Sequence, residues 1–184
     1  TINGVAHSLT YNSSTGKWEA TLTAPAGSSF NKSGGYYNVG LSAADEAGNV
    51  STADATNAEI GTNLRLVVKE KVAPTINIVS PGASAFLTTN MPTITAQLGD
   101  ADSGVKISTL AFKLDGVSIA YNAAGMTCAA VTGGYNISYT PQTALSDGAH
   151  TVTVAVADND SNTSSTACRT GYQQDCRNGI WHNE

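Results

Sequence analysis

The sequence has few charged residues and little of what long helices need. Charged residues make up only 12% of the 184 positions, and Lys, Glu and Leu are too scarce for long amphipathic helices. The abundant residues are Thr, Ser, Asn, Gly, Ala and Val, and β-branched residues such as Thr and Val suit the pleated, half-buried surface of a sheet. This composition predicts an all-β protein.

A basic cluster and a long apolar run are both missing. The formal net charge is −5, and no group of Lys and Arg could replace the counterions of a phosphate backbone, so we expect no nucleic-acid partner. No apolar run approaches the ~18–20 residues of a membrane span, so we expect no membrane insertion. The chain opens with Thr1 and shows no signal peptide, and we expect a fragment or a processed form.

Cysteine is also rare. Cys128, Cys168 and Cys176 are the three in the sequence, and their spacing is not that of a metal site. Cys168 and Cys176 could pair across a short loop, which would leave Cys128 as a small buried thiol. The sequence decides neither this pairing nor the redox compartment.

What the sequence does contain is one strand pattern used twice. Residues 35–49 begin with Gly35 and residues 147–162 with Asp147 and Gly148, and both segments alternate apolar and polar residues and end in an acidic turn. The period of two is the mark of a strand with one buried face. The apolar positions are Val39, Leu41 and Ala43 in the first copy and Val152, Val154 and Val156 in the second.

Further alternating segments, bounded by turn residues, precede and follow these copies. Residues 17–25 predict a strand whose inward face carries Trp18, Ala20 and Leu22, so we expect Trp18 in the core. About seven or eight strands at short spacing in the second half are typical of a β-sandwich. They are expected near residues 75–79, 93–98, 107–114, 117–120, 126–131, 135–140, in the segment 147–162 with its closing turn, and near residues 163–167.

The sequence predicts two domains and a tail. A short charged segment closed by Pro74 separates a first domain, residues 1–72, from a second, residues 73–168, and residues 169–184 lose the alternation and predict an irregular tail. Aligning the halves leaves the first domain without its first two or three strands, which would expose core and a sheet edge. Either the chain was cut from a longer repeat array, the interpretation that we favour, or another chain supplies the strands.

The chain resembles tandem bacterial immunoglobulin-like domains of surface proteins, adhesins and phage tail proteins. The residues that carry the resemblance are the linker 72–76, the strand and turn 44–49 and the strand start 145–152. The resemblance implies tandem immunoglobulin-like β-sandwiches that act as a non-catalytic spacer or adhesion module. Such a module is extracellular, on a cell surface or a virion, and its partners are neighbouring repeats and a cell-surface glycan or protein. Ser161, at the position of the turn glycine, departs from the pattern.

Acidic residues gather in two loops of the second domain. In an immunoglobulin-like sandwich these loops share one end, where four carboxylates could supply part of the six to eight oxygens that Ca²⁺ takes. The alternative is that these residues hydrogen-bond to the local backbone of their turns, and this second interpretation is favoured. The candidate metal ligands are Asp100, Asp102, Asp158 and Asp160.

No catalytic residue is predicted. His7, His150 and His182 lie far apart in the sequence, and no nucleophile elbow or zinc-protease motif occurs, so we expect neither an enzyme nor a required cofactor. One alternative function is a carbohydrate-binding module, for which Tyr36 and Tyr121 are the outward-facing ligand candidates. A further alternative is an assembly subunit that a neighbour completes by strand addition.

Overall fold

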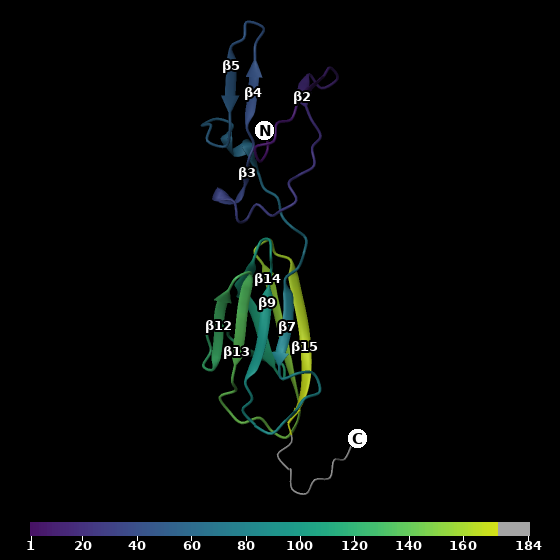
Figure 1. The fold of residues 1–184 in the computed structure, drawn as a ribbon, viewed down its shortest axis with the longest axis vertical. Coiled ribbons are helices and arrows are strands. Elements are labelled where there is room, and N and C mark those ends of the chain that lie inside the picture. Colours follow the sequence, from purple (N-terminus) through teal and green to yellow (C-terminus); the bar gives the residue numbers. More distant parts are fainter. Residues whose placement is uncertain (173–184) are drawn as a thin grey trace. The chain divides into compact units, whose positions relative to one another are not determined.

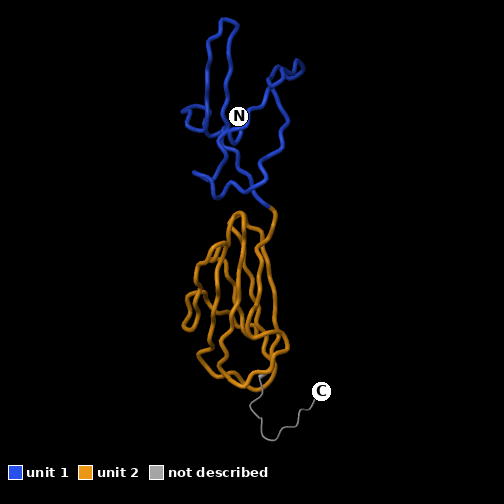
Figure 2. Tube along the Cα trace, in the orientation of Figure 1, with its two compact units in different colours: residues 1–70 blue, residues 71–184 orange. Residues whose placement is uncertain are grey.

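The computed structural model describes residues 1–172 and divides into two compact units. Unit 1 is Thr1–Glu70 and unit 2 begins at Lys71 (Figure 2). The break lies two residues before the predicted one, inside the same charged segment. Within the described residues, the regular elements of both units are almost all strands, as the composition predicts.

Unit 2 is a sandwich of two sheets (Figure 1), which confirms the all-β prediction. All neighbouring strands run antiparallel except β8 and β15, which are parallel. The first sheet has the order β11 (Val117–Ile119), β10 (Val105–Leu114), β14 (Gly148–Asp158), β15 (Thr163–Tyr172), β8 (Phe86–Leu87). The second has the order β12 (Met126–Val131), β13 (Gly134–Tyr139), β9 (Ile94–Gly99), β7 (Thr75–Ser80).

The core of unit 2 lies between these sheets and follows from the alternation. Val152, Val154 and Val156 on β14 are 1%, 0% and 3% exposed. Burying a side chain of this size contributes roughly 1.5–3 kcal/mol, so the central strands supply much of the stability. The other buried members of the core are Ile94, Ala96, Leu98, Val105, Leu110, Phe112, Leu114, Ile137 and Tyr139.

Strand β15 is longer than predicted. It continues to Tyr172 and pairs its last residues with the first residues of β14, from Gly148 to Thr151. The prediction of an irregular tail from residue 169 was therefore wrong for residues 169–172. The reason is that β14 already offers a ladder of backbone donors and acceptors along its whole length, so its neighbour needs no clear alternation to pair. Residues 173–184, with Cys176, lie outside the described residues.

Unit 1 consists of three two-stranded sheets and two short 3₁₀ helices. Its small interior contains Tyr37, Leu64 and Ser29, whose hydroxyl donates to the Val68 carbonyl at 3.1 Å. The pairs are β1 (Thr10–Asn12) with β2 (Lys17–Glu19), β3 (Tyr37–Asn38) with β6 (Arg65–Leu66), and β4 (Leu41–Ala44) with β5 (Val50–Ala53). The helices are η1 (Ser33–Gly35) and η2 (Gly61–Leu64).

The predicted inward face of residues 17–25 is exposed in unit 1. Trp18 is 66% exposed and Leu22 is 40% exposed. The prediction that Trp18 belongs to the core was wrong, because within the described residues of unit 1 β2 pairs with β1 alone. Trp18 packs instead on Tyr11, with ring centroids 5.6 Å apart.

The acidic turns that end the two copies of the repeated pattern have the same geometry. In each, one carboxylate oxygen accepts the backbone N–H of an Asn four residues later at 2.8 Å, and the other accepts its side-chain amide at 2.7 Å. The pairs are Asp45 with Asn49 and Asp158 with Asn162. The residue before each Asn has a positive φ, +86° at Gly48 and +78° at Ser161.

We expect Ser161→Gly to stabilise unit 2. A left-handed conformation costs a residue with a Cβ roughly 1–2 kcal/mol, and the greater freedom of glycine in the unfolded chain offsets roughly 0.5–1 kcal/mol of that gain. The net increase in the free energy of unfolding should be about 0.5–1 kcal/mol, measured by denaturant unfolding. The reciprocal Gly48→Ser should destabilise unit 1. A loss of stability in Ser161→Gly would contradict the strain argument.

Candidate functional site

The loop that follows β9 is held by its first residue, Asp100. One oxygen of the Asp100 carboxylate accepts the backbone N–H of Asp102 at 3.1 Å and that of Gly104 at 2.6 Å. Gly104 has a φ of +85°, which suits a residue without a Cβ. The loop crosses here from the second sheet to the first, where β10 begins at Val105.

Asp158 ends β14 at the same edge of the sandwich and is fully buried. It stands opposite Val105, the first residue of β10, in the β-ladder. Both oxygens of its carboxylate accept hydrogen bonds from Asn162. A buried carboxylate needs such donors, because burial without them is costly.

Asn159 joins the two loops. Its side-chain amide donates to the carbonyl oxygens of Ser103 at 3.0 Å and Gly104 at 2.9 Å, and its backbone N–H donates to Gly104 at 3.1 Å. The sequence pattern did not predict that Asn159 connects the two loops. Only its position after a long strand could have indicated that role.

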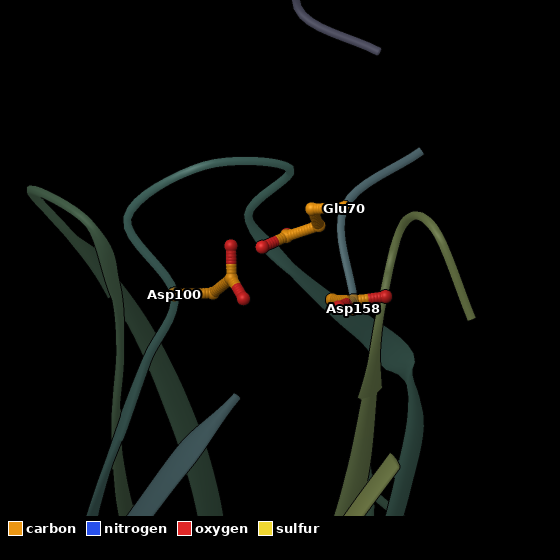
Figure 3. Close-up of side chains that lie close together, drawn as sticks. All are labelled: Glu70, Asp100 and Asp158. Atoms are coloured by element: carbon orange, nitrogen blue, oxygen red, sulfur yellow. The ribbon is translucent and has the colours of Figure 1, made fainter. Parts of the chain in front are cut away.

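The carboxylates of Asp100 and Asp158 lie close together at this end of unit 2. One oxygen of each lies within 4.8 Å of one of the other (Figure 3).

Of the four predicted metal ligands, the structure brings two into this group. Asp102 and Asp160 come from the same two loops but are not members of it. Carboxylate oxygens at this separation could hold a hard cation such as Ca²⁺. The carboxylates of Asp100 and Asp158 also accept the hydrogen bonds that shape both turns. Within the protein they therefore make the local turn contacts that the alternative to a calcium site predicts.

A second cluster surrounds His150 near the start of β14. His150 is 7% exposed. Its Nδ1 lies 2.7 Å from Oδ2 of Asp115, and its Nε2 lies 2.8 Å from the carbonyl oxygen of Ser146. Carbonyl and carboxylate oxygens only accept, so these contacts favour the protonated imidazolium, in which both ring nitrogens donate. The other carboxylate oxygen of Asp115 accepts the Thr151 N–H at 2.8 Å.

These contacts shift both pKa values in the direction of an ion pair. The hydrogen bond to Asp115 is the main cause that raises the pKa of His150, and it outweighs burial, which lowers it. Burial alone would raise the pKa of Asp115. The hydrogen bond from His150, the N–H of Thr151 and the charge of the imidazolium together lower the pKa of that carboxyl instead. The pair thus ties the hairpin turn at Asp115 to β14.

The predicted ligand tyrosines belong to different units. Tyr36 is half-buried in unit 1, with the guanidinium of Arg65 5.1 Å from its ring centroid. Tyr121 is 47% exposed in unit 2, and its carbonyl oxygen lies 3.6 Å from the sulfur of Cys128.

The two cysteines within the described residues differ in their surroundings. Cys128 is half-buried, and burial raises the pKa of its thiol. Cys168 is buried, with its sulfur 3.6 Å from the carbonyl oxygen of Pro81. The proposed pairing of Cys168 with Cys176 involves a residue outside the described part of the chain.

Comparison with protein families identifies the sandwich. Residues 74–154 match the model of a family described as a bacterial Ig domain. Unit 2 carries a bacterial Ig domain. The match begins at the linker proline and ends within β14, at Val154. It therefore includes β9 and β10 on either side of the Asp100 loop and the first part of β14.

The chain is also similar to several solved structures at low identity. A dimeric latent PorU from Porphyromonas gingivalis is 17% identical with a TM-score of 0.44, over 80% of this chain and 14% of PorU. CopC from Methylosinus trichosporium OB3b is 15% identical with a TM-score of 0.40, over 58% of this chain and 100% of CopC. Titin kinase with its flanking domains is 14% identical with a TM-score of 0.36, over 68% of this chain and 19% of that one. The chain thus spans a small part of PorU, and these likenesses carry no argument about function.

No curated protein matches the chain by sequence. In the part of the chain that the structure describes, no helix is long and apolar enough to cross a bilayer.

The His150–Asp115 pair predicts a pH-dependent stability of the Ig domain. Because folding raises the pKa of His150, its contribution is complete below the ordinary value of 6.5 and is lost as the pH rises through the higher folded value. The lowered pKa of Asp115 makes the carboxylate's contribution complete above 3.8 and lost as the pH falls through the folded value. We expect the pair's stabilisation to be greatest between these limits, measured by urea unfolding at a series of pH values.

Asp115→Asn provides the control, since the amide oxygen can still accept the Thr151 N–H. In this variant the pKa of His150, followed by NMR titration, should fall below its value in the wild type, and the pH dependence of stability should flatten near neutrality. An unchanged His150 titration in Asp115→Asn would contradict the assignment of the ion pair.

Proposed function

We propose that the chain is a non-catalytic spacer or adhesion module of a bacterial surface or phage virion protein and works outside the cell. The observation that carries the proposal is the match of residues 74–154 to a bacterial Ig domain. The polar clusters support it, because the carboxylates of Asp100, Asp158 and Asp115 and the ring of His150 hold turns and strands together.

The strand arrangement of the Ig domain suits a module under tension. The start of β7 and the end of β15 lie at opposite ends of the sandwich (Figure 1). A force that pulls on the two ends of unit 2 therefore acts parallel to these strands. It shears the hydrogen bonds between β7 and β9 and those that join β15 to β8 and β14. Hydrogen bonds loaded in this direction share the force. At the end of β15, the Ser84 N–H donates to Arg169 O and the Gly171 N–H donates to Ala85 O, both at 2.9 Å.

Single-molecule force spectroscopy tests the spacer function. We expect unit 2 to unfold in one step, and Gly171→Pro to lower the unfolding force because it removes the N–H that bonds to Ala85. Gly171→Ala is the matched control. It keeps the N–H, and its added Cβ would lie 3.6 Å from the Phe86 ring, an ordinary contact. The control should therefore unfold at the force of the wild type.

Two outcomes would contradict the spacer. One is a unit 2 that extends without a measurable unfolding force. The other is saturable binding to a glycan array that is lost in Tyr36→Ala or Tyr121→Ala, which would make the chain a carbohydrate-recognition module instead.

We also propose that Asp100 and Asp158 bind calcium. The close approach of these two carboxylates supports this second function. Ca²⁺ takes six to eight oxygens at about 2.3–2.6 Å, so Asp102, Asp160 and water would have to supply the rest. Such an ion would reinforce the contact between the two loops that Asn159 clamps.

Thermal unfolding with and without CaCl₂ tests the calcium proposal. A free concentration 100-fold above Kd stabilises the folded state by about 2.7 kcal/mol, and we expect Asp100→Asn to lose this effect. Asp45→Asn is the matched control, because it alters the equivalent turn in unit 1. A melting temperature that calcium does not change, or changes equally in Asp100→Asn, would contradict the proposal.

A further inference from the structure

Strand β12 forms one edge of the second sheet of unit 2 (Figure 1). All six of its residues pair with β13 in an unbroken register, from Met126 opposite Tyr139 to Val131 opposite Gly134. Within the described residues, no strand pairs with the other side of β12. That side therefore presents backbone donors and acceptors that a further strand could bond.

The hairpin geometry shows which residues of β12 direct their backbone groups to the open side. The Thr140 N–H donates to the Gly125 carbonyl oxygen at 3.0 Å, so these two residues form a hydrogen-bonded pair just before β12 begins. Hydrogen-bonded and non-hydrogen-bonded pairs alternate in an antiparallel ladder. The odd-numbered residues of β12 therefore bond to β13, and the backbone groups of the even-numbered residues point away from it. These residues are Met126, Cys128 and Ala130.

One of the outward-pointing groups already has a partner. The Met126 N–H donates to the carbonyl oxygen of Ala123 at 3.0 Å, which agrees with a direction away from β13. The N–H and C=O groups of Cys128 and Ala130 are the remaining complete set. An additional strand could therefore pair with the middle of β12 without breaking a bond of the hairpin.

The other edge strands of the sandwich have features that prevent strand addition. Strand β11 has three residues and β8 has two. Strand β7 has six, as β12 does, but its register with β9 shifts between Ile78 and Ser80, and Pro74 and Pro81 stand directly before and after it. Short edges, irregular pairing, prolines and charged side chains are the usual protection of a sheet edge. Strand β12, with the sequence MTCAAV, has none of these features.

We propose that the open edge of β12 is an interaction surface for β12 of a second copy of the chain. The two strands would run antiparallel about a two-fold axis at Ala129, with Cys128 of each copy opposite Ala130 of the other. In this register each N–H of Cys128 and Ala130 meets a C=O of the other copy. The two four-stranded sheets would join into one continuous sheet.

The hydrogen bond of Met126 selects this register. An axis at Cys128 would place the Ala130 carbonyl oxygen opposite the Met126 N–H of the other copy, which is already donated to Ala123. That carbonyl would lose its partner. An axis at Ala129 leaves Met126 outside the paired segment and satisfies both groups of Cys128 and of Ala130.

The side chains of β12 suit pairing with an identical strand. A strand that meets its own copy places identical residues close together near the axis, where like charges would repel, and β12 carries no charge. Ala129 is small and exposed, so the two backbones can approach at the axis. Thr127 of one copy would lie opposite Val131 of the other, and Val131 is 45% exposed. Both are β-branched, and such residues pack well across strands.

Analytical ultracentrifugation of the full chain tests the association. One pair of short strands buries less than the about 1,600 Å² of a standard interface, so we expect a weak, reversible dimer in a series of protein concentrations up to roughly 1 mM. Amide hydrogen exchange provides the residue-level readout. Exchange at Cys128 and Ala130 should slow as the protein concentration rises. Exchange at Thr127 and Ala129, whose N–H groups bond to β13, should change little.

A matched pair of variants makes the test specific. Ala129→Lys places two like charges opposite each other at the axis and should weaken the dimer by about fivefold or more. Asn77→Lys is the control. Asn77 is exposed on the same row of the sheet, through Gln97 and Asn136 to Ala129, but lies on the opposite edge strand, so this variant should dimerise as the wild type does.

A charge reversal tests the two-fold axis itself. Ala129→Glu alone should dimerise as poorly as Ala129→Lys, for the same reason of like charge. An equimolar mixture of the two variants should recover the association, because Lys and Glu then face each other across the axis.

Three results would each overturn the proposal. The first is a chain that stays monomeric over the whole concentration range. The second is a dimer that is equally stable in Ala129→Lys and Asn77→Lys, which would place the contact on another surface. The third is slow exchange at Cys128 and Ala130 at every concentration, which would assign the edge to a segment of the same chain.

Discussion

A strand with one apolar face is stable only when a second layer covers that face, and both units depend on this constraint. In unit 2 the valines of β14 are covered by β9, β13 and their neighbours, and the result is a closed core. In unit 1 the equivalent positions on β4 are uncovered, and the result is a groove with two open edges. The same sequence pattern therefore lies in a closed core in unit 2 and beside an open groove in unit 1.

Several carboxylates that the structure describes hold the backbone in place. Asp158 and Asp45 close turns of the same geometry, Asp100 shapes the loop between the sheets, and the Asp115–His150 pair connects a hairpin turn to β14. These contacts fix the turns and loops that join the strands.

Unit 2 acts as an internal reference for unit 1. Hairpin turns with positive φ at two successive residues occur at Asn3–Gly4 and at Asp115–Gly116, and the two acidic turns have the same hydrogen-bond distances. The local geometry of these turns therefore follows from their own residues and does not depend on how completely the surrounding unit is packed.

The sequence by itself determined the features that depend on neighbouring residues. Alternation and turn chemistry predicted the all-β class, the central strands and the acidic turn at Asp158, because these depend on side-chain period and local hydrogen bonds. Only the tertiary structure decided what depends on partners far away in the chain. It exposed Trp18, because burial requires a facing layer, and it brought Asp100 but not Asp102 into the carboxylate group. It also extended β15 into a stretch without alternation. It placed the ring of His150 between two hydrogen-bond acceptors, which favour its protonated form and which no short-range pattern predicts.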